Sequence, residues 1–237
     1  MKFVHWSPLH LLILAITFTI SGILAYFARI RAESKKVEII GFIFGSILIL
    51  NYFIYVSYRI YSGYWEVRYD LPMEVCNWSA FVTSMALFTK RKIYAELSYF
   101  WVMTGSIHGI LTPDLDVTFP HIYFFIFFIG HSGLVIFSIY AVFGLKLYPE
   151  KGSVLKAYLI TQAYIIIAFL INYLVNGNYG YMMAKPKAGS FLDYLGEWPF
   201  YILNLDAIIL ILFIIAYFPF YILNKRNTID DVTVKTF

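Results

Sequence analysis

Charged residues are scarce in this chain. They make up 14% of its 237 residues, whereas an ordinary globular domain carries about 25%. With so little charge, the chain cannot cover its apolar residues with the polar surface that a soluble domain of this size needs. The same shortage, combined with a high apolar content, excludes a disordered chain, a coiled coil and a nucleic-acid-binding surface.

Cysteine is nearly absent as well. The single residue, Cys76, excludes an internal disulfide and a metal site built from several thiolates. The five histidines show no recognisable ligand spacing, so the sequence suggests neither a metal nor a soluble cofactor. No G-x-S-x-G or H-E-x-x-H string occurs, which argues against an intramembrane protease.

Apolar residues are plentiful instead. Hydrophobic types make up 61% of the chain, aromatic types 21%, and the mean hydropathy is +0.73. Crossing a bilayer takes roughly 20 mostly apolar residues in a helix. The sequence therefore predicts an all-α, polytopic membrane helical bundle that forms one domain over 1–237. Its seven predicted spans are about 9–28, 39–58, 71–89, 93–111, 119–143, 156–176 and 199–223.

The first apolar run is too long for the core of a signal peptide, and no A-x-A site follows it, so we expect it to remain as a helix. With the N-terminus outside and the C-terminus cytoplasmic, 13 of the 18 lysines and arginines fall on the cytoplasmic side. Such a bias is typical of membrane proteins, so the net charge of +4 calls for no polyanionic partner. The longest connection, 177–198, then lies outside. Its Gly, Tyr, Pro and Trp residues suit either an interfacial lid or a plain aromatic loop.

Polar side chains within the predicted spans are the functional candidates, because a charged group at mid-bilayer costs about 2.5–3.5 kcal/mol. Two of them, Glu96 and Gln162, fall in the inner half. The others converge on the outer half: Cys76, His108 and His131 as catalytic candidates, and Glu74, Asn77, Asn172, Asn204 and Asp206, together with Asp114 in a connecting segment, as substrate-binding candidates. Each has an ordinary alternative as a packing or helix-bridging residue.

A thiol, two imidazoles and a carboxylate in one half of the bilayer can supply a nucleophile, a base and an orienting group. Cys76 is the expected nucleophile, and His131 or His108 the expected base. With spans at these boundaries, helical rise places His131 roughly 10 Å deeper than Cys76. A separation of that size would favour His108.

Four strings resemble a known family. They are LPMEVCN at 71–77, GILTPDL at 109–115, FFIGHS at 127–132, and the run 176–199, which contains NGNYGYM, KP and LDYLGEWP. In order and spacing they are similar to the YwaF-like family of bacterial integral membrane proteins, relatives of the animal transmembrane protein 164.

The resemblance implies a multi-pass bacterial cell-membrane protein that transfers acyl groups, since the animal relative is regarded as an acyltransferase of ether phospholipids. The implied catalytic pair is Cys76 and His131, and the implied partner is a phospholipid or lysophospholipid in the bilayer. Glu74 stands where relatives often carry a histidine, and His108 stands where they often carry a glutamine, so His108 is a second candidate base.

Two other functions remain open. A small-solute or lipid transporter would line a pathway with polar residues that also reach the inner leaflet. A non-catalytic scaffold would leave Cys76 dispensable and would use the outer loop as its partner surface. The oligomeric state, the acyl donor and the acceptor are not encoded in these patterns.

Overall fold

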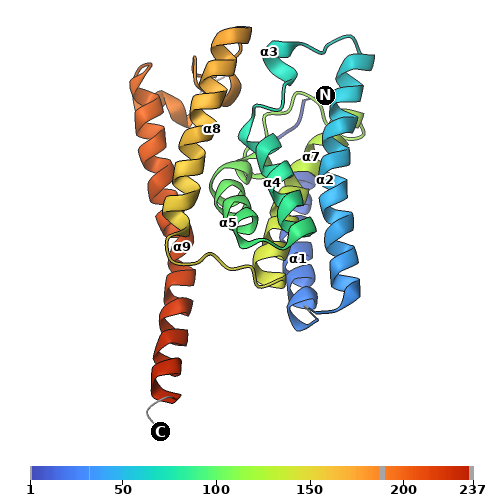
Figure 1. Cartoon of the computed structure of the whole chain (residues 1–237). Helices are drawn as coiled ribbons and strands as arrows, with labels where there is room; N and C mark the ends of the chain where they lie inside the picture. Colours follow the sequence, from blue (N-terminus) through green and yellow to red (C-terminus); the bar gives the residue numbers. More distant parts are fainter. Residues whose placement is uncertain (1, 32, 187–189, 235–237) are drawn as a thin grey trace.

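The structure, a computed structural model, describes residues 2–31, 33–186 and 190–234, with side chains described as far as Leu223. Residues 187–189 of the predicted outer loop lie outside this range. The described chain is all-α (Figure 1). Its N-terminal segment and the end of its last helix lie toward opposite ends of the bundle.

Within the described residues, five helices are long and apolar enough to cross a membrane. They are α1 (Pro8–Ile30), α2 (Lys35–Tyr61), α7 (Ile122–Ile139) with its π-helical continuation η2 (Tyr140–Gly144), α8 (Ser153–Val175) and α9 (Phe200–Val234), whose apolar part ends at Leu223. By this helix composition the chain is a multi-pass membrane protein. The predicted helical bundle is confirmed to that extent, and all five helices begin within four residues of the start of a predicted span.

The third and fourth predicted spans are interrupted. The third contains α4 (Val75–Thr89), and the fourth is divided into α5 (Lys92–Trp101), the π-helical segment η1 (Val102–Ser106) and α6 (His108–Leu111). Lys90 turns the chain between α4 and α5 in a left-handed conformation with φ 53°. The 15 residues of α4 cover about 22 Å, which is less than the hydrocarbon thickness of about 30 Å.

The late start of α4 has a local cause. Leu71 precedes a proline, and the proline ring disfavours helical geometry at the residue before it. Leu71 accordingly has an extended backbone, with φ −67° and ψ 153°, and it ends the short helix α3 (Val67–Asp70). The chain becomes helical again only at Val75.

The segment between α3 and α4 runs into the bundle. In Figure 1, α4 begins well below the upper ends of α2 and α8. Tyr164, midway along α8, is buried and donates a 2.8 Å hydrogen bond to the carbonyl of Met73. The first turn of α4 therefore lies inside the protein, and its depth does not follow from counting residues along a full-length span.

The helices pack around α4, α5 and α7. On one side α2 packs on α4 and α1 packs on α7, while on the other side α8 contacts α5 and α9 contacts η1 (Figure 1). Large aromatic side chains fill the core: Phe100, Tyr140 and Phe213 are almost fully buried. Because this packing is continuous through η1, the irregular segment is held by helices on several sides.

A buried ion pair closes the upper end of α2. The carboxylate of Asp70, which is 2% exposed, accepts hydrogen bonds from Arg59 at 2.8 and 3.0 Å, from the Glu66 backbone N–H at 2.8 Å, and from the Tyr55 hydroxyl. These contacts join α2 to α3 just before the chain turns into the bundle.

We predict that Asp70→Asn destabilises the protein by about 2 kcal/mol, because it leaves the Arg59 guanidinium without its charged partner. Thermal unfolding in detergent measures the change. The matched control is Lys90→Gln, which breaks the exposed pair between Lys90 and Glu38 and should change stability little. Equal melting of Asp70→Asn and the control would show that the buried pair contributes nothing specific.

Candidate catalytic site at the start of α4

Cys76 is the second residue of α4. The side chain of Glu74, which precedes this helix, makes no capping hydrogen bond to it, so the first turn keeps unpaired N–H groups and the positive end of the helix dipole. Such a position favours a thiolate. The Ser106 hydroxyl of η1 lies beside the thiol and donates a 3.2 Å hydrogen bond to Ser79. The helix end and this hydroxyl favour a thiolate, whereas the apolar surroundings disfavour one, so Cys76 would act as a nucleophile only with a neighbouring base.

His131 lies on α7, with its ring stacked on Phe127 at a centroid distance of 4.3 Å. Its Nδ1 is 2.9 Å from the Phe127 carbonyl oxygen. A carbonyl oxygen only accepts hydrogen bonds, so Nδ1 carries the proton and Nε2 of the neutral ring presents a lone pair. This tautomer suits a general base.

Gly109 on α6 allows the His131 ring to pack directly against its backbone. A Cβ placed on Gly109 would lie 2.7 Å from Nε2 of His131 and 2.8 Å from its Cγ, which is too close for any side chain. Gly109 is three residues after Ser106, so the two share one face of the η1–α6 segment. Cys76 and His131 therefore contact this segment about one turn apart, and α4, η1 and α7 also pack against one another.

His108 has a different environment. Its side chain is exposed and makes no hydrogen bond to another side chain or backbone group in the described parts of the chain. Only its backbone carbonyl is engaged, by Thr112. The orientation and packing of His131 make it the better candidate base. The difference in depth between Cys76 and His131 that favoured His108 assumed a full-length span, and it does not apply because the chain enters the bundle before α4 begins.

The loop between α8 and α9, which we call the outer loop after its predicted side, covers the point where the chain enters the bundle. The short helix η3 (Tyr179–Tyr181) contributes the buried Tyr179, whose hydroxyl donates to the Val67 carbonyl at 2.6 Å and accepts from the Leu71 N–H at 2.8 Å. Burial raises the pKa of this hydroxyl above its usual value, which keeps it protonated as a donor. The adjacent Gly180 N–H donates to the Glu74 carboxylate at 3.1 Å.

The sequence profile of the TMEM164 family matches residues 5–217. The chain belongs to the TMEM164 family. The match covers all five long apolar helices in whole or in part, and it is wider than the strings at 71–199 that carried the resemblance. No curated protein and no solved structure is significantly similar to the chain.

Several residues of this TMEM164-family chain that were predicted to bind substrate form hydrogen bonds within the protein. Asn172 is fully buried, and its amide accepts from the Tyr179 N–H at 2.7 Å and donates to the Tyr179 carbonyl at 2.9 Å. Asn204 donates to Leu195 at the end of the short helix η4 (Phe191–Leu195). Both asparagines therefore hold the outer loop in place.

Asp206 lies on the contact between α8 and α9, where it accepts hydrogen bonds from Tyr158 at 2.5 Å and Gln162 at 2.7 Å. Asn77 is half-buried and Asp114 is exposed, and neither side chain has a hydrogen-bond partner within the described residues. Glu74, Cys76 and Asn77 thus lie at the start of α4 and His131 packs on Gly109 of α6, whereas Asp206 belongs to the α8–α9 pair. In the described part of the TMEM164-family chain, no group of three or more His, Cys, Asp and Glu side chains is arranged to hold a metal ion.

No sequence pattern singled out the residues that build the walls of this site. Ser106, Gly109, Tyr164 and Tyr179 belong to common types in a chain with 21 tyrosines and 14 glycines. The only available signal was the position of Gly109 at the start of the GILTPDL string. Their importance comes from contacts between distant segments, such as Tyr179 with Leu71.

We predict that Asn172→Ala releases η3. Loss of two hydrogen bonds, each of about 1 kcal/mol, should speed amide hydrogen exchange over 177–182 by roughly thirtyfold. The control is Asn204→Ala, which should affect only the region around 191–196. Unchanged exchange over 177–182 in Asn172→Ala would show that the loop is held by other contacts.

Proposed function

We propose that this TMEM164-family protein is a membrane-embedded lipid acyltransferase or transacylase that forms an acyl-enzyme on Cys76. The observation that carries the proposal is that Cys76 and His131 contact the same η1–α6 segment, Cys76 beside Ser106 and His131 against Gly109, with no proton on Nε2 of the neutral His131 ring. Acyl transfer through a covalent intermediate requires a nucleophile and a base, and these two side chains are our candidates for those roles.

The reaction proceeds in two halves. Nε2 of His131 takes the Cys76 proton, and the thiolate attacks the carbonyl carbon of a phospholipid ester. The carbon–oxygen bond to glycerol breaks, the leaving alkoxide takes the proton from the imidazolium, and a lysophospholipid departs from the thioester. His131 then deprotonates the hydroxyl of an acceptor lysophospholipid, whose oxygen attacks the thioester and regenerates the thiol.

Irregular backbone inside the bundle supports this proposal. Non-helical chain at membrane depth is tolerated only where it is buried in protein or lines a cavity. Here the segment 71–74, the π-helical η1 and the start of α4 meet beneath the outer loop. Segments of π-helix within α-helices frequently occur at functional sites. Glycerol esters lie just below the headgroups, so we place the reaction in the outer leaflet.

The polar cluster of Tyr158, Gln162 and Asp206 is the observation that favours transport. Through this cluster the polar side chains extend along α8 to Gln162, which lies in the predicted inner half of the bilayer. Each of the two carboxylate oxygens of Asp206, however, already accepts a hydrogen bond from α8. The cluster therefore suits a bridge between two helices better than a solute pathway, and acyl transfer is the function that we propose.

We predict that Cys76→Ala abolishes acyl transfer and that His131→Ala lowers its rate by roughly 10²–10⁴-fold. The assay uses the purified protein in liposomes with an isotope-labelled phospholipid donor and a lysophospholipid acceptor, and lipid mass spectrometry reads the products. Intact-protein mass should show the thioester adduct on the wild type and not on Cys76→Ala.

The matched control is His108→Ala, which should retain a rate near that of the wild type because its side chain is exposed. Gly109→Ala provides an independent test of the geometry. Its methyl group displaces the His131 ring, and an error in position of this kind costs roughly 100-fold in rate. Full activity of Cys76→Ala, or equal losses in the two histidine variants, would contradict the proposed roles.

We also propose that α4 and the α5–η1–α6 segment cross the membrane with the five long helices, which gives seven spans with the N-terminus outside a bacterial cell membrane and the C-terminus cytoplasmic. In support, successive helices alternate in direction in Figure 1, and α4 and α5 form a hairpin. The excess of lysine and arginine on one side agrees with this orientation.

This topology predicts the labelling of single cysteines introduced into the Cys76→Ala background. In intact cells a membrane-impermeant thiol reagent should modify Lys2→Cys but not Lys90→Cys. After the cells are permeabilised, Lys90→Cys should react as well. The reverse pattern would invert the orientation, and labelling of both in intact cells would rule out an odd number of spans between them.

A further inference from the structure

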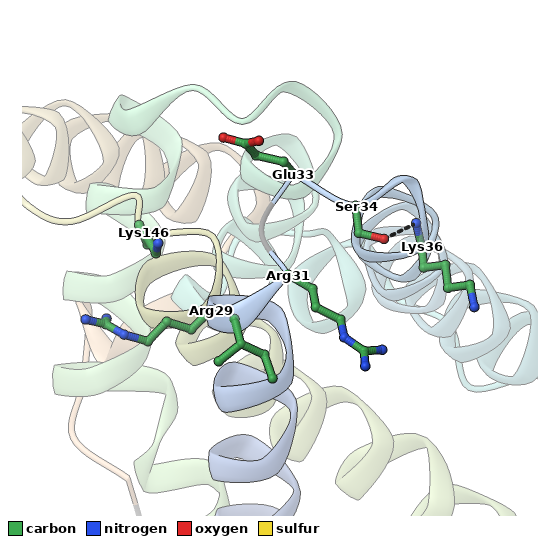
Figure 2. Close-up of a pocket in the computed structure, with 7 residues that line it drawn as sticks. Arg29, Arg31, Glu33, Ser34, Lys36 and Lys146 are labelled. Carbon is green, nitrogen blue, oxygen red and sulfur yellow. Dashed lines mark hydrogen bonds between the residues drawn. The ribbon is translucent and has the colours of Figure 1, made fainter.

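A hollow of about 540 Å³ lies at the end of the bundle opposite the start of α4, where α1 ends and α2 begins (Figure 2). It is lined by the ends of these two helices and by the segment that follows η2. Four of its lining side chains are cations: Arg29, Arg31, Lys36 and Lys146. Glu33 is the one acidic residue that lines it.

The backbone around this hollow is held in place. The Ser34 N–H donates to the Arg31 carbonyl at 2.8 Å and closes the turn between α1 and α2. Gly144, the last residue of η2, packs so closely on α1 that a Cβ there would lie 2.8 Å from the Ala28 Cβ. Arg29 donates to the Tyr148 hydroxyl, which ties the segment after η2 to the end of α1. These contacts therefore fix the backbone segments that carry the cations.

These cations differ from nearby lysines because they form no ion pair with an acidic side chain of the described residues. At the same end of the bundle, Lys90 pairs with Glu38 and Lys92 pairs with Glu150. None of the ion pairs formed between described residues includes a cation of the hollow, namely Arg29, Arg31, Lys36 or Lys146. In Figure 2, Arg31 and Lys36 extend to one side of the turn, while Arg29 and Lys146 lie on the other. The local excess of positive charge is left for a ligand to neutralise.

We propose that this hollow binds the phosphate group of an anionic phospholipid in the headgroup layer at this end of the bundle. The long apolar faces of α1 and α2 end here, so the cations stand at the depth where lipid phosphates lie. The guanidinium of an arginine matches the oxygens of a phosphate in a bidentate arrangement, and a lysine adds a mobile point charge. The start of α2, a 27-residue helix, adds its positive dipole end.

The test is retention of lipid by the full-length protein. The wild type, solubilised from vesicles of phosphatidylglycerol and phosphatidylcholine in equal amounts, is expected to carry phosphatidylglycerol preferentially in native mass spectrometry. The double variant Arg31→Gln/Lys36→Gln should lose this preference by roughly tenfold or more, since it removes two basic groups whose charge no acidic partner among the described residues neutralises. Lys146→Gln, whose side chain lies on the other side of the turn, should have the smaller effect.

The control Lys90→Gln/Lys92→Gln removes the same number of charges at the same end of the bundle and should leave the preference unchanged. Circular dichroism and gel filtration establish that each variant is folded. Equal losses in the two double variants would overturn the proposal in favour of a diffuse surface charge. If the protein bound inorganic phosphate but retained no lipid, the proposal that the phosphate belongs to a lipid would be wrong. Failure of this site would leave the proposed chemistry at Cys76 untouched.

Discussion

The structure depends on how the backbone between α3 and α4 satisfies its hydrogen bonds inside an apolar bundle. A buried carbonyl or N–H group without a partner is costly, so non-helical chain at depth needs side chains to meet it. Tyr164 binds the Met73 carbonyl from α8, and Tyr179 bridges Val67 and Leu71 from the outer loop. These two tyrosines allow α4 to begin within the protein instead of at its surface.

Several features of the candidate site follow from that recessed start. Cys76 lies in the first turn of a helix that begins inside the bundle, against the π-helical segment η1. The loop that supplies Tyr179 also covers the site, and Asn172 fixes the loop to α8. Gly109 leaves room for the His131 ring on the same wall. The contacts that hold the irregular backbone in place thus also shape the candidate site.

Charged side chains have different surroundings at the two ends of the bundle. At the upper end, Asp70 is buried and satisfied by Arg59 and its neighbours, so its charge stabilises the fold. At the opposite end, the cations around the turn between α1 and α2 are exposed and lack acidic partners among the described residues. Burial requires a charge to be paired, whereas exposure at a membrane surface leaves it able to bind a ligand.

The sequence by itself determined the class of protein and most of its helices, because apolar runs of about 20 residues and scarce charge leave only a bilayer as the solvent. It also singled out Cys76 and His131, since rare polar types within apolar runs are conspicuous. It did not predict the broken third and fourth spans, although Pro72 marks the place. Only the tertiary structure decided that His131 faces Gly109, that Asn172 holds a loop, and that Ser106 adjoins the thiol, because these contacts join segments whose separation in space no local pattern records.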